Sequence, residues 1–379
     1  MRIALALILC LAAASATAAP RDKNGANPQA QTQVQAAAES VRDIYRSGTV
    51  ATIMAGGSSS TDLAIAAELA EVLDGDELRV LPIVGKGAMQ NVKDVMFLRG
   101  VDMGITQANV LKHFAATGEL GPNFQDEIVY VAKLFNEEVH VLARRDVHNI
   151  AALAGKTVSL GVEGSGGAIT GQLLFEALGI EIKPLHLADA EAIAKLKEGE
   201  IDAAIVIAGK PAPFTARLHA ADALRLLSIP YPKALEDSYY PAILTHEDYP
   251  DLIGEGESLD TVSVCAVLIS FNWPHGGARY RRVAKFVDAF FGSFDAFLEE
   301  PHHPKWREVN FAATLEGWQR SAAAQAWIDA AQTKTEAASK RSFETFLAQA
   351  SKESRTPVSA EERAELFRAF LEWSKDRSD

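Results

Sequence analysis

Five turns that follow predicted strands carry side chains suited to holding a small polar solute. The first is rich in hydroxyl groups and closes with a carboxylate; it reads Gly56-Gly57-Ser58-Ser59-Ser60-Thr61-Asp62. Helix capping would account for one or two of these hydroxyls, whereas four in a row favour contact with a ligand. Asp62 stands where a helix dipole favours a negative charge, so stabilisation of the helix is the alternative to a binding role.

The second and third turns add a cation and an amide. The second reads Gly85-Lys86-Gly87-Ala88-Met89-Gln90-Asn91. If Lys86 faces a closing cleft rather than solvent, the solute carries a carboxylate, because an unpaired ammonium in a dry cleft costs several kcal/mol. In the third turn, Thr106-Gln107-Ala108-Asn109, the Gln107 amide offers an acceptor and two donors to a polar ligand. A helix-capping network is the alternative for Gln107.

The fourth turn is rich in glycine and reads Glu163-Gly164-Ser165-Gly166-Gly167-Ala168-Ile169-Thr170. It is not the dinucleotide fingerprint, because Ile169 stands where the last glycine should be, and no P-loop Lys-Ser/Thr pair follows. With these nucleotide motifs excluded, the turn reads as a glycine-rich start of a helix, where backbone N–H groups can bind an anion. The fifth turn is Ala208-Gly209-Lys210-Pro211. The ligand-binding residues predicted from all five turns are Gly57, Ser58, Ser59, Ser60, Thr61, Asp62, Lys86, Met89, Gln107, Glu163, Gly164, Ser165, Gly166, Ala168, Gly209 and Lys210.

Motifs of catalysis and metal binding are missing from the sequence. It contains neither a Gly-x-Ser-x-Gly nucleophile elbow nor a His-Glu-x-x-His zinc motif. A secreted α/β hydrolase would need Ser165 as nucleophile and His140 or His186 as base, and neither histidine has a supporting context. Cys10 and Cys265 are the only cysteines, too few for a disulfide framework or a cysteine metal site. We therefore expect a binding protein without catalytic residues, cofactor or metal.

Composition places the chain among globular proteins. It has 379 residues, of which 48% are hydrophobic and 23% are charged, and this length allows two or more packed cores. Lys and Arg number 37 against 50 Asp and Glu, for a formal net charge of -13. No basic stripe is left to meet a phosphate backbone, so nucleic acid is excluded as a partner.

The first residues predict export. An apolar run, Ile3 to Ala14, follows Arg2 and precedes the small residues Ala16-Thr17-Ala18, a pattern typical of a secretory signal peptide over residues 1–19. A retained membrane anchor is the alternative. Residues 20–47 read as a flexible polar lead. Cleavage removes Cys10, and we expect the remaining thiol, Cys265, to be buried in its apolar surroundings.

Strand and helix patterns alternate twice along the chain and predict an α/β fold with parallel sheet. The predicted strands are 50–54, 78–83, 103–105, 157–162, 182–186 and 203–207, and the predicted helices between them are 63–73, 88–98, 168–178 and 191–198. Two further strand-like runs, 138–143 and 261–270, suggest two crossings between lobes. Beyond Tyr280 the pattern is helical, with helices predicted at 283–298, 322–331 and 341–350 and a last one behind a capping box of Ser359 and Glu362.

Three groups of residues, in this order and spacing, resemble the TAXI-type solute-binding proteins of tripartite ATP-independent periplasmic (TRAP) transporters. They are Asn91-Val92-Lys93-Asp94 with Gly100-Val101-Asp102-Met103-Gly104-Ile105-Thr106-Gln107; Gly155-Lys156-Thr157-Val158-Ser159 with Gly164-Ser165-Gly166; and Gly199-Glu200-Ile201-Asp202-Ala203-Ala204 with Ala208-Gly209-Lys210-Pro211. The resemblance covers roughly Val50 to Ala330.

The resemblance implies a two-lobed periplasmic binding protein of type II, with two hinge strands and the ligand between the lobes. Lobe 1 would be residues 48–143 and 261–332, lobe 2 residues 144–260, and residues 333–379 an added C-terminal helical extension. The partners implied are a small-molecule solute of the amino acid or organic acid class and a TRAP membrane permease driven by an ion gradient. A periplasmic sensor that signals to a membrane partner is the alternative function.

The first turn departs from the family, whose members bind small carboxylates such as glutamate, glutamine or 2-oxoglutarate. Ser58 to Ser60 replace glycine-like positions, and Asp62-Leu63 stand where aromatic residues are usual. If Asp62 lines the pocket, its carboxylate would repel an anionic solute and prefer an ammonium or a hydroxyl group.

Overall fold

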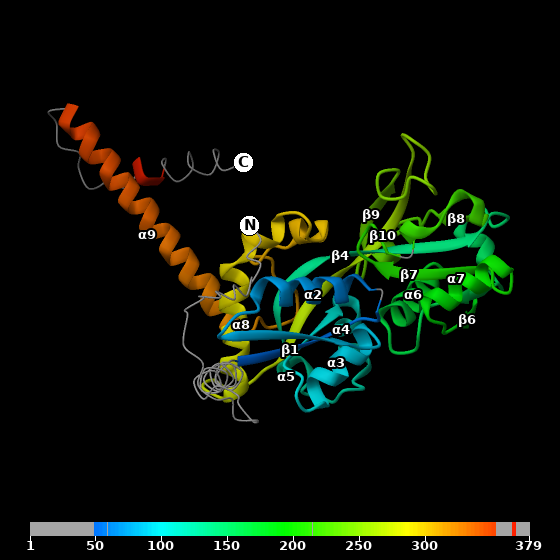
Figure 1. Ribbon diagram of the computed structural model, residues 1–379, viewed down its shortest axis with the longest axis horizontal. Coiled ribbons are helices and arrows are strands. Elements are labelled where there is room, and N and C mark those ends of the chain that lie inside the picture. Colours follow the sequence, from blue (N-terminus) through cyan, green and yellow to red (C-terminus); the bar gives the residue numbers. More distant parts are fainter. Residues whose placement is uncertain (1–48, 59, 214, 354–365, 369–379) are drawn as a thin grey trace, which may run out of the picture. The chain divides into compact units, whose positions relative to one another are not determined.

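The computed structural model describes residues 49–58, 60–213, 215–353 and 366–368 (Figure 1). The predicted signal peptide and lead, Ser59, and the predicted capping box of Ser359 and Glu362 lie outside these residues. The strands are β1 (Thr49–Ala55), β2 (Leu78–Val84), β3 (Met103–Gln107), β4 (Ile128–Arg144), β5 (Thr157–Ser159), β6 (Lys183–Leu185), β7 (Ala203–Ala208), β8 (Leu224–Leu227), β9 (Tyr240–Thr245) and β10 (Ser258–Phe271). The α-helices are α2 (Thr61–Leu73), α3 (Ala88–Phe97), α4 (Ala108–Thr117), α5 (Phe124–Glu127), α6 (Gly166–Ala177), α7 (Asp189–Glu198), α8 (Ala278–Gly292) and α9 (Ala322–Glu353).

The prediction of an α/β fold is confirmed. The described strands form one hydrogen-bonded sheet in the order β2-β1-β3-β10-β4-β7-β5-β6, with β8 paired to β4 and β9 to β10. β1 is parallel to β2 and β3, and β5 is parallel to β6 and β7, as strand–helix alternation requires. β4 and β10 run antiparallel to each other and to their other neighbours, so the sheet is mixed.

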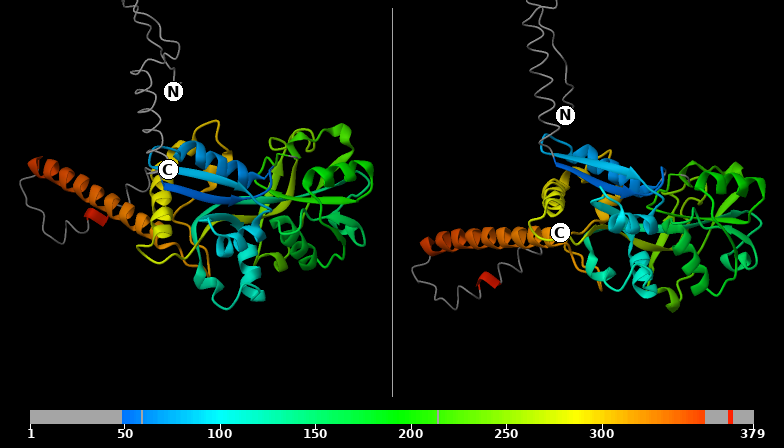
Figure 2. Two further views of the ribbon diagram at one scale, coloured as in Figure 1. Left: turned by 60° about the horizontal axis from the view of Figure 1, so that its bottom comes forward. Right: turned by 90° about the horizontal axis from the view of Figure 1, so that it is seen from below.

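β4 and β10 join two halves of this sheet. The first half contains β1, β2, β3 and residues 128–135 of β4; the second half contains β5 to β9 and residues 138–144 of β4. Figure 2 shows the second half, in green, at the far end of the long strands from the blue strands of the first half. The predicted connectors 138–143 and 261–270 are thus parts of two longer, paired strands, which pass from one half to the other near the pairing of Asn136 with Cys265. Both strands are buried along most of their length, which is why each contains apolar residues at consecutive positions.

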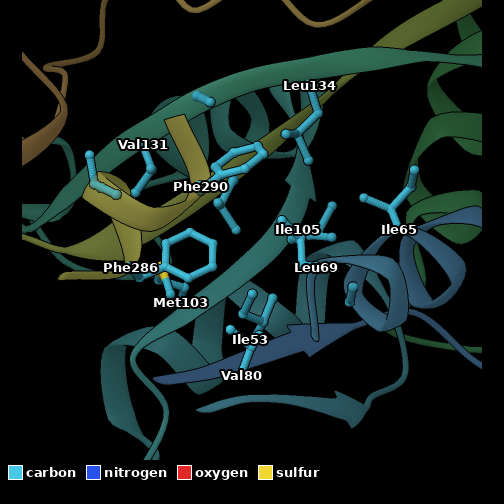
Figure 3. Close-up of a cluster of buried hydrophobic side chains, with 14 of the residues drawn as sticks. Ile53, Ile65, Leu69, Val80, Met103, Ile105, Val131, Leu134, Phe286 and Phe290 are labelled. Atoms are coloured by element: carbon cyan, nitrogen blue, oxygen red, sulfur yellow. The ribbon is translucent and has the colours of Figure 1, made fainter. Parts of the chain in front are cut away.

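Helices cover both faces of the first half. On one face α2 and α8 pack over β1, β2 and β3, and the resulting cluster is drawn in Figure 3. Its labelled side chains are Ile53, Val80, Met103 and Ile105 from β1 to β3, Val131 and Leu134 from β4, Ile65 and Leu69 from α2, and Phe286 and Phe290 from α8. The other face is covered by α3 and α4, which bury Val92, Val95 and Phe114. Burying a large apolar side chain contributes about 1.5–3 kcal/mol, so these clusters hold the strand ends in fixed positions.

The second half has its own apolar clusters. α6 buries Leu174 and Phe175 on one face of β5 and β7, while α7 buries Ile193 and Leu196 on the other. Ser165 and Asp189 stand at or next to the first residues of these two helices, so packing of the helices positions both side chains.

The helical end of the chain differs from the prediction in two places. The helix predicted at 283–298 ends at Gly292 and is followed by a 3-10 turn, Phe294–Leu298. The helices predicted at 322–331 and 341–350 are one helix, α9, because the intervening residues contain no glycine or proline and several good helix formers. α9 therefore runs through position 333, where the C-terminal extension was expected to begin. α4, which the sequence did not reveal, ends at Gly118 in the left-handed conformation (φ 67°).

Two further expectations concern Cys265 and the membrane. Cys265 is buried, as predicted, and burial raises the pKa of its thiol to about 11. Among the described helices, none has the length and apolar character needed to cross a bilayer.

Candidate functional site

A cavity of about 180 Å³ lies at the carboxyl ends of the parallel strands, between the two halves of the sheet. The first half contributes the turn after β1, the turn after β2 and Gln107 at the end of β3, and Glu137 lines the cavity from β4 where that strand passes from one half to the other. The second half contributes the turn after β5, the start of α7, and two isoleucines of β7, Ile205 and Ile207. Ligands of open α/β sheets bind at such strand ends, so this cavity is the candidate site.

Two of the cavity hydroxyls cap helices. Ser60 Oγ accepts a hydrogen bond from the Leu63 N–H at 3.1 Å, and Ser165 Oγ accepts one from the Ala168 N–H at 3.2 Å. Both serines line the cavity as well. Helix capping therefore explains Ser60. Asp62 does not cap α2, because Ser60 already does.

Gln107 and Glu137 of the cavity lining belong to a polar network. Gln107 Nε2 donates to Glu137 Oε2 at 2.7 Å, and Gln107 Oε1 accepts from the Thr170 hydroxyl at 2.9 Å. Asn109 Nδ2 donates in turn to Thr170 Oγ1 at 2.8 Å. Gln107 and Asn109 belong to the first half and Thr170 to the second, so the network joins the halves. The Gln107 amide thus uses its oxygen and one of its two N–H groups in hydrogen bonds within the protein. Its second N–H can donate to a ligand.

Asp62 and Glu137 are buried carboxyl groups in the cavity wall. Asp62 is 5% exposed and its Oδ1 has no hydrogen-bond partner in the described part of the chain, while Glu137 is 2% exposed. Burial raises the pKa of Asp62 to about 7. Burial, followed by the charge of Asp62, raises the pKa of Glu137 well above its usual range, against the opposing hydrogen bond from Gln107. The two groups together hold at least part of a proton at neutral pH.

Asp189 and Lys86 complete the charged lining. Asp189 stands in the first turn of α7, and burial raises the pKa of its carboxyl. Lys86 is exposed at the cavity edge, and within the described residues its ammonium makes no ion pair. The lining thus contains three carboxyl groups and one ammonium.

An ion triad of two buried side chains, Lys305 and Glu138, and the exposed Glu308 holds β4 next to Glu137. Lys305 Nζ is 2.6 Å from Glu138 Oε1 and 2.6 Å from Glu308 Oε1. Glu138 Oε2 also accepts a hydrogen bond from the Lys210 N–H at 2.9 Å. Because Glu138 is adjacent to Glu137 on β4, the triad fixes the strand that presents Glu137.

The predicted ligand-binding residues separate into two groups. Those that line the cavity are Gly57, Ser58, Ser60, Asp62, Lys86, Gln107, Ser165 and Gly166. Met89, Glu163, Gly164 and Ala168 instead line a neighbouring surface depression, of about 550 Å³, that shares Lys86 with the cavity. Ser59 lies outside the described residues.

Thr61, Gly209 and Lys210 serve contacts within the protein. The Gly209 N–H donates to Thr61 Oγ1 at 3.0 Å, which links α2 to the end of β7. Lys210 Nζ donates to Asp248 Oδ2 and to the Ile243 carbonyl, both at 2.9 Å. A contact of these three residues with a ligand in the cavity stays a prediction, and the Lys210 ammonium is already satisfied by its own half.

Sequence reasoning missed Glu137 and Asp189. A signal for the first existed: Glu137 and Glu138 are two adjacent acidic residues inside a strand made mostly of apolar residues, and a buried carboxyl group is a candidate for a functional site. Asp189 had a weaker signal, because an acidic residue in a first helical turn is commonly only a favourable charge.

The hydrolase alternative has no support in the geometry. His140 Nε2 lies 2.6 Å from the Tyr249 hydroxyl and its Nδ1 lies 3.3 Å from the Val206 carbonyl. His186 Nδ1 lies 3.3 Å from the Gly161 carbonyl. Neither contact is with Ser165, whose hydroxyl caps α6.

The α/β fold thus places an open cavity with polar and charged lining at the strand ends, where folds of this kind bind small molecules. Residues 53–269, more than half of the chain, match the model of the NMT1-like family. The chain belongs to the NMT1-like family.

Similar solved structures include several binding proteins. MatC from Rhodopseudomonas palustris with bound malate is 17% identical, with 68% of this chain and 86% of that chain covered and a TM-score of 0.44. The periplasmic binding protein BugD is 16% identical, with 68% and 85% covered and a TM-score of 0.43. The alkanesulfonate-binding protein SsuA from Xanthomonas axonopodis pv. citri bound to MOPS is 18% identical, with 66% and 78% covered and a TM-score of 0.39.

Proposed function

We propose that this protein is a periplasmic receptor that encloses a small polar solute between two lobes and delivers it to a TRAP-type permease. The lobes are residues 48–143 with 261–332, and residues 144–260. The observation that carries the proposal is the cavity, which is lined from both halves of the sheet and bridged by the network of Gln107 and Thr170. The signal-peptide pattern of residues 1–19 supports export.

Close backbone contacts around the cavity support capture by closure. The Gln90 N–H of the first half donates to the Gly164 carbonyl of the second at 3.1 Å. A Cβ atom added to Gly166 would lie 2.5 Å from Gln107 Oε1, and one added to Gly87 would lie 3.1 Å from Ser165 Cα. Side chains at these positions would hold the halves apart, so the glycines allow them to meet.

Substituting Gly166 by alanine should therefore weaken solute binding by about tenfold or more, because the closed arrangement becomes strained. Thermal shift with a panel of amino acids, dicarboxylates and aromatic acids first identifies a solute, since a ligand at about 100 times its Kd adds roughly 2.7 kcal/mol of stability. Gly292→Ala is the matched control, because a Cβ there meets nothing within 4 Å. Equal affinities of wild type and Gly166→Ala would contradict closure.

Uptake and transcription in a strain that lacks the gene distinguish a transport receptor from a sensor. Loss of uptake of the identified solute on deletion of the gene supports delivery to a permease. Unchanged uptake together with a lost transcriptional response to the solute would support the sensor alternative.

A further inference from the structure

We infer that the solute enters the cavity with a protonated amine, which binds between the carboxyl groups of Asp62 and Glu137. The inference rests on the proposed receptor function and specifies the class of solute as small primary amines. An anionic carboxylate group, expected from Lys86, can then occupy only the exposed end of the cavity.

The first step is the unpartnered oxygen of Asp62. The side chain is 95% buried, lines the cavity, and leaves Oδ1 without a hydrogen-bond donor in the described structure. Its helix does not need it as a cap, because Ser60 already accepts from the Leu63 N–H. A buried acceptor left without a donor is unfavourable, so the missing partner is a group that donates.

The second step is the charge around that oxygen. Glu137 is a second buried carboxyl in the same wall, and Asp189 faces the cavity from α7. Lys305, whose charge opposes the rise in the pKa of Glu137, is bound by Glu138 and Glu308. Lys86 is exposed at the edge. The inner wall therefore attracts a cation and repels a carboxylate.

The third step is the donor geometry and the size. An ammonium has three N–H donors, enough to meet Asp62 and Glu137 together, whereas a hydroxyl has one. The cavity volume of about 180 Å³ equals the volume that roughly six water molecules occupy in the liquid. The solute that fits is small, with one ammonium inside and its other end near Lys86.

Protonation of Asp62 and Glu137 competes with amine binding and makes it pH-dependent. An ammonium favours the charged carboxylates, so it displaces protons from Asp62, whose pKa is about 7, and from Glu137, whose pKa is also raised. The groups that face this pair are Asp189, Glu138, Lys305 and Lys86. Amine affinity should rise with pH between 6 and 8, and calorimetry in buffers of different ionisation enthalpy should show proton release. Affinity that is constant or falls over this range would contradict the assignment.

The decisive experiment compares four probes of equal chain length by isothermal titration calorimetry: 1,4-diaminobutane, 4-aminobutyrate, butane-1,4-diol and succinate. We expect the two amines to bind wild type about tenfold or more tightly than the diol or succinate. Asp62→Asn should reduce amine affinity by about tenfold or more. Asp76→Asn, a substitution of an exposed aspartate, is the matched control and should change nothing.

Each other outcome overturns the inference. Tighter binding of succinate than of the amines would contradict the amine assignment without contradicting the receptor function. Amine binding that Asp62→Asn does not weaken would do the same. If no probe binds wild type, the amine assignment fails, and the broader thermal-shift panel decides separately whether the cavity takes any solute. Glu137→Gln provides a second test should Asp62→Asn fail to fold, since its amide keeps the size of the side chain.

Discussion

The ligand-free Asp62→Asn variant should be more stable than wild type at pH 8, by roughly 1–3 kcal/mol. Burial raises the pKa of Asp62 from its ordinary 3.8 to about 7, so the folded protein favours the neutral carboxyl. The stability that this neutral form contributes is fully present below about pH 4 and is lost as the pH rises through about 7. Asparagine stays neutral throughout, and its advantage therefore grows with pH.

Urea unfolding of both proteins between pH 5 and 8 measures this difference. His140 also makes stability depend on pH in part of this range, because burial lowers its pKa from 6.5 to about 4 in the folded protein. This contribution is present in both proteins and cancels in the comparison. Asp76→Asn should keep the pH dependence of wild type. The expectation fails if the difference between Asp62→Asn and wild type does not change with pH. Since no ligand is present, the result tests the burial of Asp62 independently of what the cavity binds.

The sequence predicted those cavity residues that lie in turns directly after strands. Ser60, Asp62, Gln107 and Ser165 stand at strand ends, and the carboxyl ends of parallel strands gather at one edge of a sheet. Glu137 could not be placed in the same way, because it lies inside β4, where neighbouring residues alternate between the two faces. Which face looks into the cavity is decided by the pairing of β4 with β10, a contact distant in sequence.

The fold was predictable to the extent that local pattern specifies it. Alternating strands and helices gave the two parallel series, whereas the long reach of β4 and β10 depends on non-local pairing. In the sequence, Lys86 and Asp62 indicate opposite charges for the solute, and only the structure shows which of the two side chains is buried. Lys86 indicated an anionic solute, yet its side chain lies exposed at the edge while Asp62 and Glu137 lie buried at the wall.

Replacing Lys305 by methionine should destabilise the protein by about 3–5 kcal/mol, because it leaves buried carboxylate without its counter-ion. Lys305 and Glu138 have side chains only 2% and 4% exposed, and Nζ lies 2.6 Å from Glu138 Oε1. Burial raises the pKa of Glu138, and Lys305 opposes that rise. Without Lys305 the Glu138 carboxyl takes up a proton more readily, so the loss of stability should be larger at pH 8 than at pH 5.

The chain offers a matched control in Lys195, whose Nζ is also 2.6 Å from a carboxylate oxygen, that of Glu200. That pair is exposed, and exposed pairs are screened by water and salt, so Lys195→Met should change the unfolding free energy far less. Adding Glu138→Gln to Lys305→Met removes the unpaired charge and should restore about half of the lost stability. The two lysines share a contact distance and differ in burial. Equal effects of their substitution would show that desolvation does not govern the triad, and would remove the argument that the triad holds β4 and Glu137 in place.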